Sequence, residues 1–130
     1  LSWVQMRGEE QHLPIGDKPD GKIIFTDFGL VAVSIADKTR AKLVTGDFSS
    51  ANIVEKAAAF ERYLGYIARY ELLDGRIKLL ILNCSYPNWI GQEQVRVPAF
   101  DEDHLTLRAP PREVNGVPVS AALTWRRDIN

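Results

Sequence analysis

The sequence predicts an all-β protein, an antiparallel up-and-down barrel of about eight to ten strands with one helix inserted before the middle strands. Short turn-rich connectors separate runs of β-branched and aromatic residues, and one segment has the periodicity of a helix. A parallel α/β fold would need a helix between most of its strands. A closed barrel is preferred to an open sandwich because closure removes the exposed edges of a long meander.

Composition predicts one globular domain over residues 1–130 and excludes several classes of partner. The chain is 45% hydrophobic and 25% charged, which is ordinary for a folded protein. Its net charge of -1 provides no broad positive field, so we expect no nucleic-acid partner. The apolar run at residues 79–82 is far shorter than the roughly 20 residues of a membrane span, so we expect no membrane partner.

Cysteine usage favours a reducing compartment. Cys84 is the one cysteine, so no intramolecular disulfide can form. The chain opens without a basic flank and a long apolar core, so no signal peptide is visible. We therefore expect a cytoplasmic protein.

The region before the helix contains three predicted strands, at residues 3–6, 22–26 and 30–35. A loop dense in proline and glycine covers residues 14–21, and Asp27-Phe28-Gly29 indicates a hairpin. Residues 38–48 are polar and ambiguous, with a short edge strand and a flap over the barrel mouth as the two interpretations.

The predicted helix is a single apolar stripe formed by Ile53, Ala57, Phe60 and Leu64. Asn52 with Glu55 three residues later resembles a capping box, and Gly65 suits the residue after the helix end. An apolar stripe must be covered to be stable in water. We therefore expect this helix to pack against the barrel wall or to plug one end.

Five further strands are predicted after the helix, at residues 66–72, 76–85, 92–100, 105–108 and 117–127. Asp74-Gly75 is the sharpest hairpin signal, because a type I′ turn needs positive φ at both central positions. The segment from Pro110-Pro111 to Asn115-Gly116 is interpreted as a turn.

Polar side chains on consecutive middle strands form the best candidate site. Strand side chains alternate between faces, so Tyr66 shares a face with Tyr70 and Gln94 shares one with Arg96. If those faces point inward, Arg96 binds an enolate or carboxylate and Tyr70 or Tyr66 moves a proton, with Asn83 and Gln94 contacting the ligand. In the alternative, Arg96 faces solvent and its valine neighbours fill the core.

Two aromatic residues in the turn after the second of these strands are further candidates. Trp89 lies at an expected barrel mouth, where it is either a lid over the ligand or an ordinary packing anchor. Tyr86 opens the same turn, and we include it with Trp89 among the ligand-binding residues.

No metal or cofactor is predicted. His12 and His104 belong to no metal-ligand spacing, and no second cysteine exists to complete a thiolate site. Cys84 is more simply a small hydrophobic residue of a strand than a nucleophile. Glu71 and Glu93 are weaker acid–base candidates, because both adjoin turns and an unpaired carboxylate is rarely buried.

The chain also resembles a known family over essentially its whole length. The residues that carry the resemblance are Ser2-Trp3, Pro14-Ile15-Gly16-Asp17, Ile24-Phe25-Thr26-Asp27-Phe28-Gly29, Glu55-Lys56-Ala57-Ala58-Ala59-Phe60, Arg69-Tyr70-Glu71, Tyr86-Pro87-Asn88-Trp89-Ile90-Gly91 and Leu123-Thr124-Trp125-Arg126-Arg127. In this order they are similar to the small lipocalin-like domain family of bacteria and fungi. The resemblance implies an antiparallel barrel with an interior cavity.

The same resemblance bears on function. Members of this family often occur among genes for secondary-metabolite assembly, and related barrels either isomerise or cyclise bound intermediates or only carry ligands. Family members often place histidines and a carboxylate on the strand where this chain has Leu79, Leu80 and Leu82. The resemblance therefore gives no support to histidine chemistry here.

Three functions follow from these observations. The first is a cofactor-free isomerase or cyclase that acts on an apolar polyketide- or terpenoid-type intermediate inside the barrel. The second is a non-catalytic carrier or sequestering protein for a hydrophobic ligand. The third is a structural or regulatory partner whose barrel is filled by side chains. The sequence leaves a homodimer open.

Overall fold

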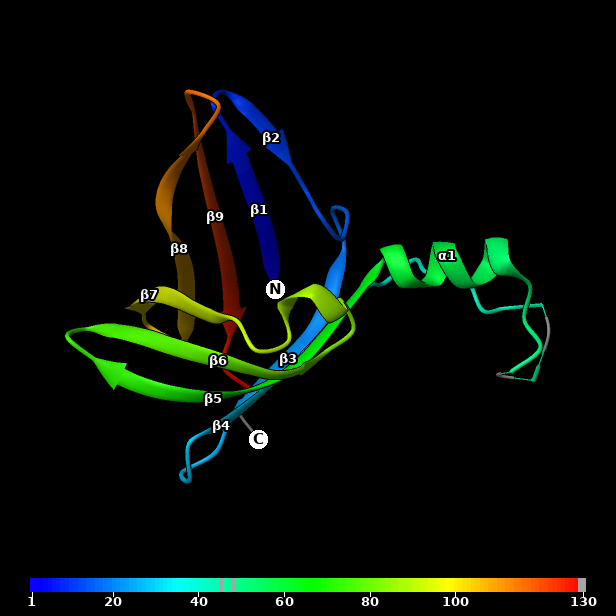
Figure 1. Cartoon of the computed structure of the whole chain (residues 1–130), viewed down its shortest axis with the longest axis horizontal. Coiled ribbons are helices and arrows are strands. Elements are labelled where there is room, and N and C mark those ends of the chain that lie inside the picture. Colours follow the sequence, from blue (N-terminus) through cyan, green and yellow to red (C-terminus); the bar gives the residue numbers. More distant parts are fainter. Residues whose placement is uncertain (45, 48, 129–130) are drawn as a thin grey trace.

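The computed structural model describes residues 1–44, 46–47 and 49–128 and consists of antiparallel strands with one α-helix (Figure 1). The elements in chain order are β1 (Ser2–Arg7), β2 (Glu10–His12), β3 (Pro19–Phe25), β4 (Leu30–Asp37), α1 (Ile53–Glu61), β5 (Tyr63–Leu73), β6 (Arg76–Cys84), the 3₁₀ helix η1 (Pro87–Trp89), β7 (Glu93–Asp101), β8 (His104–Val114) and β9 (Val117–Arg126). The all-β prediction with one helix before the middle strands is confirmed.

All nine strands form one sheet in the order β2-β1-β9-β8-β7-β6-β5-β4-β3. In Figure 1 the sheet bends so that β8, β9 and β1 run across the direction of β4, β5 and β6. The bend lies in β7, whose first residues pair with β6 and whose later residues, from Val97, pair with β8. A strongly curved sheet of this kind has a concave inner face, as a barrel does.

The barrel is not closed by hydrogen bonds. The sheet order ends at β2 and β3, and no ladder joins these two strands among the described residues. An ion pair between Lys22 on β3 and Asp128, two residues after β9, connects the β3 edge to the chain that follows β9. We call the unpaired junction the seam.

The core lies on the concave face. Val31, Val33 and Ile35 alternate along β4 and are almost completely buried. Ile77 and Leu79 do the same along β6. Because successive side chains of a strand point to opposite faces, these residues fix which face of each paired strand is inside.

Two details of the strands differ from the sequence prediction. β2 was not predicted, because its three residues are polar and fully on the surface, and they gain their strand geometry from pairing with β1. Pro110 and Pro111 lie inside β8 and not in a turn. The pairing of β8 with β9 shifts between Ala109 and Arg112, so the missing proline N–H groups fall where the ladder is already interrupted.

The helix differs more. α1 ends at Glu61 with Arg62 as its C-cap, and Leu64 already belongs to β5, so the prediction that Gly65 follows the helix end is wrong. The helix buries none of its residues, and Ile53 is 83% exposed. It extends away from the sheet (Figure 1), so the prediction that it packs against or plugs the barrel is also wrong. The Asn52 cap is confirmed: its side chain accepts a hydrogen bond from the Glu55 N–H at 2.9 Å.

The segment between β4 and α1 forms neither strand nor helix in its described part, so the edge-strand interpretation of residues 38–48 is wrong for residues 38–44 and 46–47. Thr45 and Phe48 lie outside the described residues. The Asp74-Gly75 turn is confirmed, with φ of 52° and 73° at its two residues, as a type I′ hairpin requires.

Candidate ligand cavity

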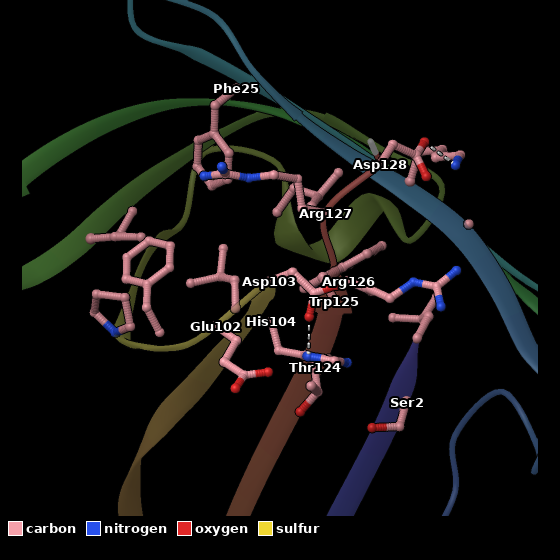
Figure 2. Close-up of a pocket in the computed structure, with 18 of the residues that line it drawn as sticks. Ser2, Phe25, Glu102, Asp103, His104, Thr124, Trp125, Arg126, Arg127 and Asp128 are labelled. Atoms are coloured by element: carbon pink, nitrogen blue, oxygen red, sulfur yellow. Dashed lines mark hydrogen bonds and ion pairs between the residues drawn. The ribbon is translucent and has the colours of Figure 1, made fainter. Parts of the chain in front are cut away.

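The main candidate site is a cavity of about 1140 Å³ at one end of the curved sheet. Its wall is made by inward-facing residues of β3, β5, β6, β7, β8 and β9, and Figure 2 shows the side chains that surround it. The apolar and aromatic lining residues are Leu1, Ile23, Phe25, Tyr70, Leu72, Ile77, Pro98, Phe100, Leu105 and Trp125. A cavity of this size and lining is typical of sites for small organic molecules.

Phe25 and Tyr70 form one aromatic wall of this cavity. Their rings meet edge to face, with centroids 5.2 Å apart and an interplanar angle of 87°. The Tyr70 hydroxyl donates a hydrogen bond to the backbone carbonyl of Thr26. This bond uses the hydroxyl proton of Tyr70 and holds its ring in place against the hairpin that follows β3.

Charged and polar side chains surround the outer part of the cavity. They include Lys22, Asp103, His104, Arg126, Arg127 and Asp128, several of which are labelled in Figure 2. His104 Nδ1 lies 2.8 Å from Asp103 Oδ1, and the His104 side chain is about half exposed. A polar rim around an apolar interior fits a site that holds the apolar body of a ligand and leaves its entrance in water.

Strand register decides the orientation of Arg96. On β7, Arg96 pairs with Ile77 and Gln94 pairs with Leu79, and both partners are buried on the inner face. Arg96 and Gln94 therefore point inward. Of the two orientations that the sequence allowed for Arg96, the structure has the one that faces the interior and not solvent. Arg96 donates from Nη2 to Gln94 Oε1 at 2.8 Å and from Nη1 to the Val95 carbonyl at 2.9 Å.

Tyr66 also faces the interior and lies close enough to Arg96 for each to affect the ionisation of the other. Burial raises the pKa of the Tyr66 phenol, and the positive charge of Arg96 opposes that rise. Burial lowers the pKa of the Arg96 guanidinium. Cys84 pairs with Tyr66 across β5 and β6 and raises the phenol's pKa further. The structure thus brings Tyr66, Gln94 and Arg96 together inside the sheet.

Asn83 does not join this cluster. It pairs with Ile67, an exposed residue on the outer face, and its side chain accepts a hydrogen bond from the Cys84 N–H at 2.9 Å. A register shift next to Ile67 separates this end of β6 from the regular alternation at Ile81. The prediction that Asn83 places an amide in the interior is therefore wrong. Asn83 instead lines a shallower groove of about 430 Å³.

Tyr86 and Trp89 lie outside the lining of the main cavity. Their rings meet edge to face with centroids 5.7 Å apart. Trp89 is partly buried against the core, whereas Tyr86 is 42% exposed. Trp89 therefore packs against the core, which agrees with its interpretation as a packing anchor. It is not a lid over the main cavity, because it does not line that cavity.

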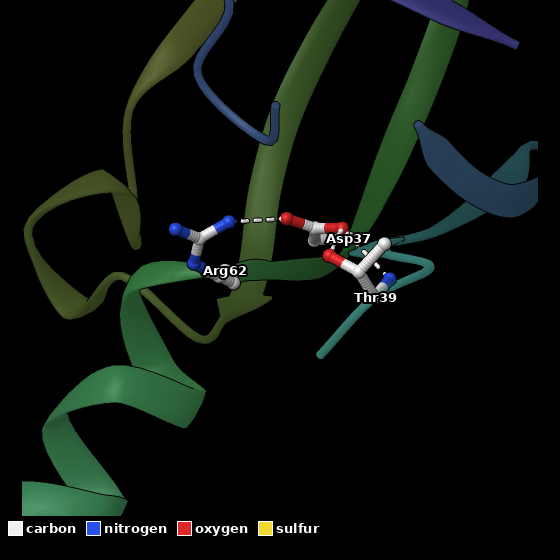
Figure 3. Close-up of polar contacts among 3 residues, drawn as sticks. All are labelled: Asp37, Thr39 and Arg62. Atoms are coloured by element: carbon white, nitrogen blue, oxygen red, sulfur yellow. Dashed lines mark hydrogen bonds and ion pairs between the residues drawn. The ribbon is translucent and has the colours of Figure 1, made fainter. Parts of the chain in front are cut away.

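A separate polar cluster joins β4 to the end of α1 (Figure 3). The Asp37 carboxylate is buried, accepts hydrogen bonds from the Thr39 hydroxyl at 2.7 Å and the Thr39 N–H at 2.8 Å, and forms an ion pair with Arg62. The two Thr39 bonds, followed by Arg62, hold the pKa of Asp37 below its ordinary value. Because every charge is paired, this cluster has the character of a structural clamp.

The described part of the chain contains no group of three or more histidine, cysteine, aspartate or glutamate side chains that could hold a metal ion. No helix among the described residues is long and apolar enough to cross a membrane.

Most of the cavity wall was missed from the sequence. Of the seven predicted site residues, Tyr70 lines the main cavity, whereas Phe25, Phe100, Leu105 and Trp125 were not singled out. The usable signal was alternation. Leu105, Leu107, Leu123 and Trp125 recur at every second position of two adjacent strands, which indicates one apolar face.

A curved antiparallel sheet with a cavity at one end is the architecture of a small-molecule-binding barrel. A family model described as lipocalin-like domain matches residues 2–128. The chain belongs to this family, and it is a lipocalin-like ligand-binding domain.

One relative is informative about this class. The chain is 33% identical over 90 residues to the 4′-hydroxy-3′-methoxypropiophenone carrier protein of Aspergillus oryzae (strain ATCC 42149 / RIB 40). The matched region covers 62% of this chain and 81% of that protein. No solved structure matches.

Proposed function

We propose that this protein is a carrier that binds a small, largely apolar aromatic molecule non-covalently in the end cavity. The observation that carries this proposal is the cavity of about 1140 Å³ with Phe25, Tyr70, Phe100 and Trp125 on its wall. Aromatic rings pack against ligand rings edge to face or offset, and burial of the ligand supplies most of the binding free energy.

The cavity's own chemistry favours carriage over catalysis. General acid–base catalysis needs a side chain that can give or take a proton at the ligand. The proton of the Tyr70 hydroxyl is donated to the Thr26 carbonyl, and the rim residue His104 is paired with Asp103. Among the lining residues, the hydroxyl of Tyr70 is therefore held by the protein backbone and not free to give its proton to a ligand. The relative that is named as a carrier supports the same choice.

The relative also suggests the ligand class. The cargo in its name is an aryl ketone with phenol and methoxy substituents, a small aromatic of the kind made in secondary metabolism. We infer that the ligand of this chain is a natural product of similar size, met in the cytoplasm. The reducing setting favoured by the single cysteine agrees with that location.

Isothermal titration calorimetry with 4′-hydroxy-3′-methoxypropiophenone tests this proposal. Leu105→Trp fills the cavity from the inner face of β8 and should weaken binding by at least about tenfold. Arg108→Trp is the matched control, because Arg108 lies on the same strand and is exposed on the outer face. Equal affinity in both variants would place the ligand outside this cavity, and no binding by the unaltered protein would remove this ligand class.

A second candidate is the cofactor-free isomerase or cyclase. The observation that favours it is the inward-facing pair of Arg96 and Tyr66, in which each residue affects the pKa of the other. In that reaction Arg96 would stabilise a developing enolate and Tyr66 or Tyr70 would transfer the proton. Arg96→Ala and Tyr70→Phe should then abolish turnover of the ligand with little change in melting temperature. Unchanged recovery of the ligand after incubation with the protein would leave carriage as the function.

A homodimer, which the sequence leaves open, is a matter for direct measurement. Sedimentation velocity over a range of protein concentrations measures it directly, since a dimer would appear as a concentration-dependent rise in sedimentation coefficient.

A further inference from the structure

The Arg96 guanidinium is a positive charge on the inner face of the sheet without a negative partner among the described residues. Its two hydrogen bonds go to neutral oxygens, those of Gln94 and the Val95 carbonyl. Its register partner Ile77 and the neighbouring inner-face residue Leu79 are apolar. Arg96 is partly buried, and a guanidinium that loses hydration is usually compensated by an opposite charge.

The rest of the interior supplies no acceptor for this charge. Asp37 is the buried carboxylate of the described chain, and Thr39 and Arg62 already bind its oxygens. The indole N–H groups of Trp3 and Trp125 are buried without an acceptor in the same residues. The described interior thus holds the charge of Arg96 without a carboxylate and two indole N–H groups without an acceptor.

Arg96 also adjoins the main cavity. Ile77, its cross-strand partner, lines the cavity wall, and so do Pro98 and Phe100, the next two inward-facing residues of β7. Arg96 does not itself line the cavity, because its guanidinium is directed toward Gln94 and Tyr66. A ligand held in the cavity reaches this charge by extending past Ile77.

We propose that the barrel takes its ligand as an oxyanion, a phenolate, enolate or carboxylate, with the Arg96 guanidinium as the counter-charge. This inference rests on the proposed function, because it assigns the charge of the molecule held in the same cavity. Pairing with an oxyanion compensates Arg96 for the hydration that it loses on partial burial. The planar guanidinium can bind two oxygens, or one strongly charged oxygen. A neutral ligand of the same shape gains the apolar wall alone.

The ionisation of 4′-hydroxy-3′-methoxypropiophenone provides a direct readout. The acyl group para to the phenol delocalises the charge of the phenolate, so ionisation moves the absorption band to longer wavelength. At a pH below the phenol's own pKa, the free probe is mostly neutral. We expect the protein-bound probe to show the phenolate band at that pH, and Arg96→Gln to return the bound probe to the neutral band with at least about tenfold weaker affinity.

Two controls separate this charge effect from packing. The methyl ether of the probe, 3′,4′-dimethoxypropiophenone, cannot ionise and should bind the unaltered protein and Arg96→Gln equally. Arg108→Gln removes an exposed outer-face charge and should leave the phenolate band intact. If Arg96→Gln does not fold, the spectra and the affinities of probe and ether with the unaltered protein still decide the question.

The outcomes separate this inference from the proposed function. If both probe and ether bind and the bound probe keeps the neutral band, the cavity binds ligand and the oxyanion inference is wrong. If neither compound binds, both proposals fail for this ligand class. A phenolate band that persists in Arg96→Gln would show that another group stabilises the anion, and would overturn the role of Arg96.

Discussion

Arg62, the C-cap residue of helix α1, forms an ion pair with the buried carboxylate of Asp37 at the end of β4. The Asp37 N–H also donates to the Arg62 carbonyl at 3.0 Å. The exposed helix is therefore attached to the sheet at its C-cap. This contact couples the first half of the sheet to the strand β5, which starts one residue later.

The Asp37 cluster predicts a pH dependence of stability. The pKa of Asp37 is held below its ordinary value of 3.8, first by the Thr39 hydroxyl and N–H and then by Arg62. The folded state therefore favours the ionised carboxylate. Its contribution to stability is fully present above the unfolded value and is lost as pH falls through the lower folded value. The melting temperature of Asp37→Asn should lie below that of the unaltered protein near neutral pH, and the gap should narrow in acid.

Asp20→Asn is the control for that measurement, because Asp20 is exposed on the neighbouring strand β3. A gap between Asp37→Asn and the unaltered protein that stays constant down to strong acid would show that the carboxylate charge is not the source of the difference.

The concave face of β4 predicts a large core effect. Ile35 is 0% exposed, whereas Ile24 on the neighbouring strand β3 is 59% exposed on the outer face. Ile35→Ala should lower the free energy of unfolding by about 2–5 kcal/mol, because it removes buried methylene groups and leaves a cavity. Ile24→Ala should change it by roughly 0.5 kcal/mol or less. Urea denaturation of both variants measures the difference, and similar losses would mean that the outer face is covered in solution.

The sequence alone could predict which face of some strands is buried. β4 alternates sharply, and the turn residues Asp74 and Gly75 fixed the hairpin between β5 and β6. The inner face of β7 was harder to predict. Val95 and Val97 are apolar enough to be core residues, so alternation alone did not show whether Arg96 faces inward or outward. The decision came from pairing with Ile77, a long-range contact that no local pattern encodes.

The hydroxyl of Tyr70 predicts a split between stability and binding. Tyr70→Phe removes the hydrogen bond to the Thr26 carbonyl but keeps the ring against Phe25. The free energy of unfolding should fall by about 1 kcal/mol, since one hydrogen bond is lost and a carbonyl is left unpaired. Affinity for the propiophenone should change by less than about threefold, as measured by calorimetry. A loss of binding comparable to that of Leu105→Trp would give the hydroxyl a direct role at the ligand.

The cap of α1 predicts a local effect. Asn52 caps the helix through the Glu55 N–H, and its own amide donates to the Glu55 carboxylate at 2.9 Å. Asn52→Ala should destabilise the helix by about 1 kcal/mol. Because α1 buries none of its residues, the melting temperature of the sheet should stay unchanged while the amides of residues 53–61 exchange faster. A drop in the global melting temperature would show that the helix packs on the sheet in solution.

The sequence predicted the helix but not its exposure, and the reason is physical. Ile53 and Phe60 form the stripe that normally marks a buried helix face, yet the short connection through Arg62 to Tyr63 makes the chain enter β5 at once. The direction of that entry carries the stripe away from the concave face. The outward orientation of Asn83 was likewise not predictable from the sequence. Regular alternation from Ile81 would have turned Asn83 inward, but the register shift beside Ile67 reverses the face of the residues that follow.

The seam has a consequence for the proposed carrier function. No backbone ladder joins β2 to β3 in the described chain, and the Lys22–Asp128 ion pair between β3 and the segment after β9 is largely exposed. Dissolved salt screens an exposed ion pair while leaving apolar contacts intact. For the proposed carrier, salt should therefore change the rates of ligand entry and release at the seam more than the apolar contacts that hold the ligand. The residence time of the proposed ligand would then depend on ionic strength without any change in the residues that bind it.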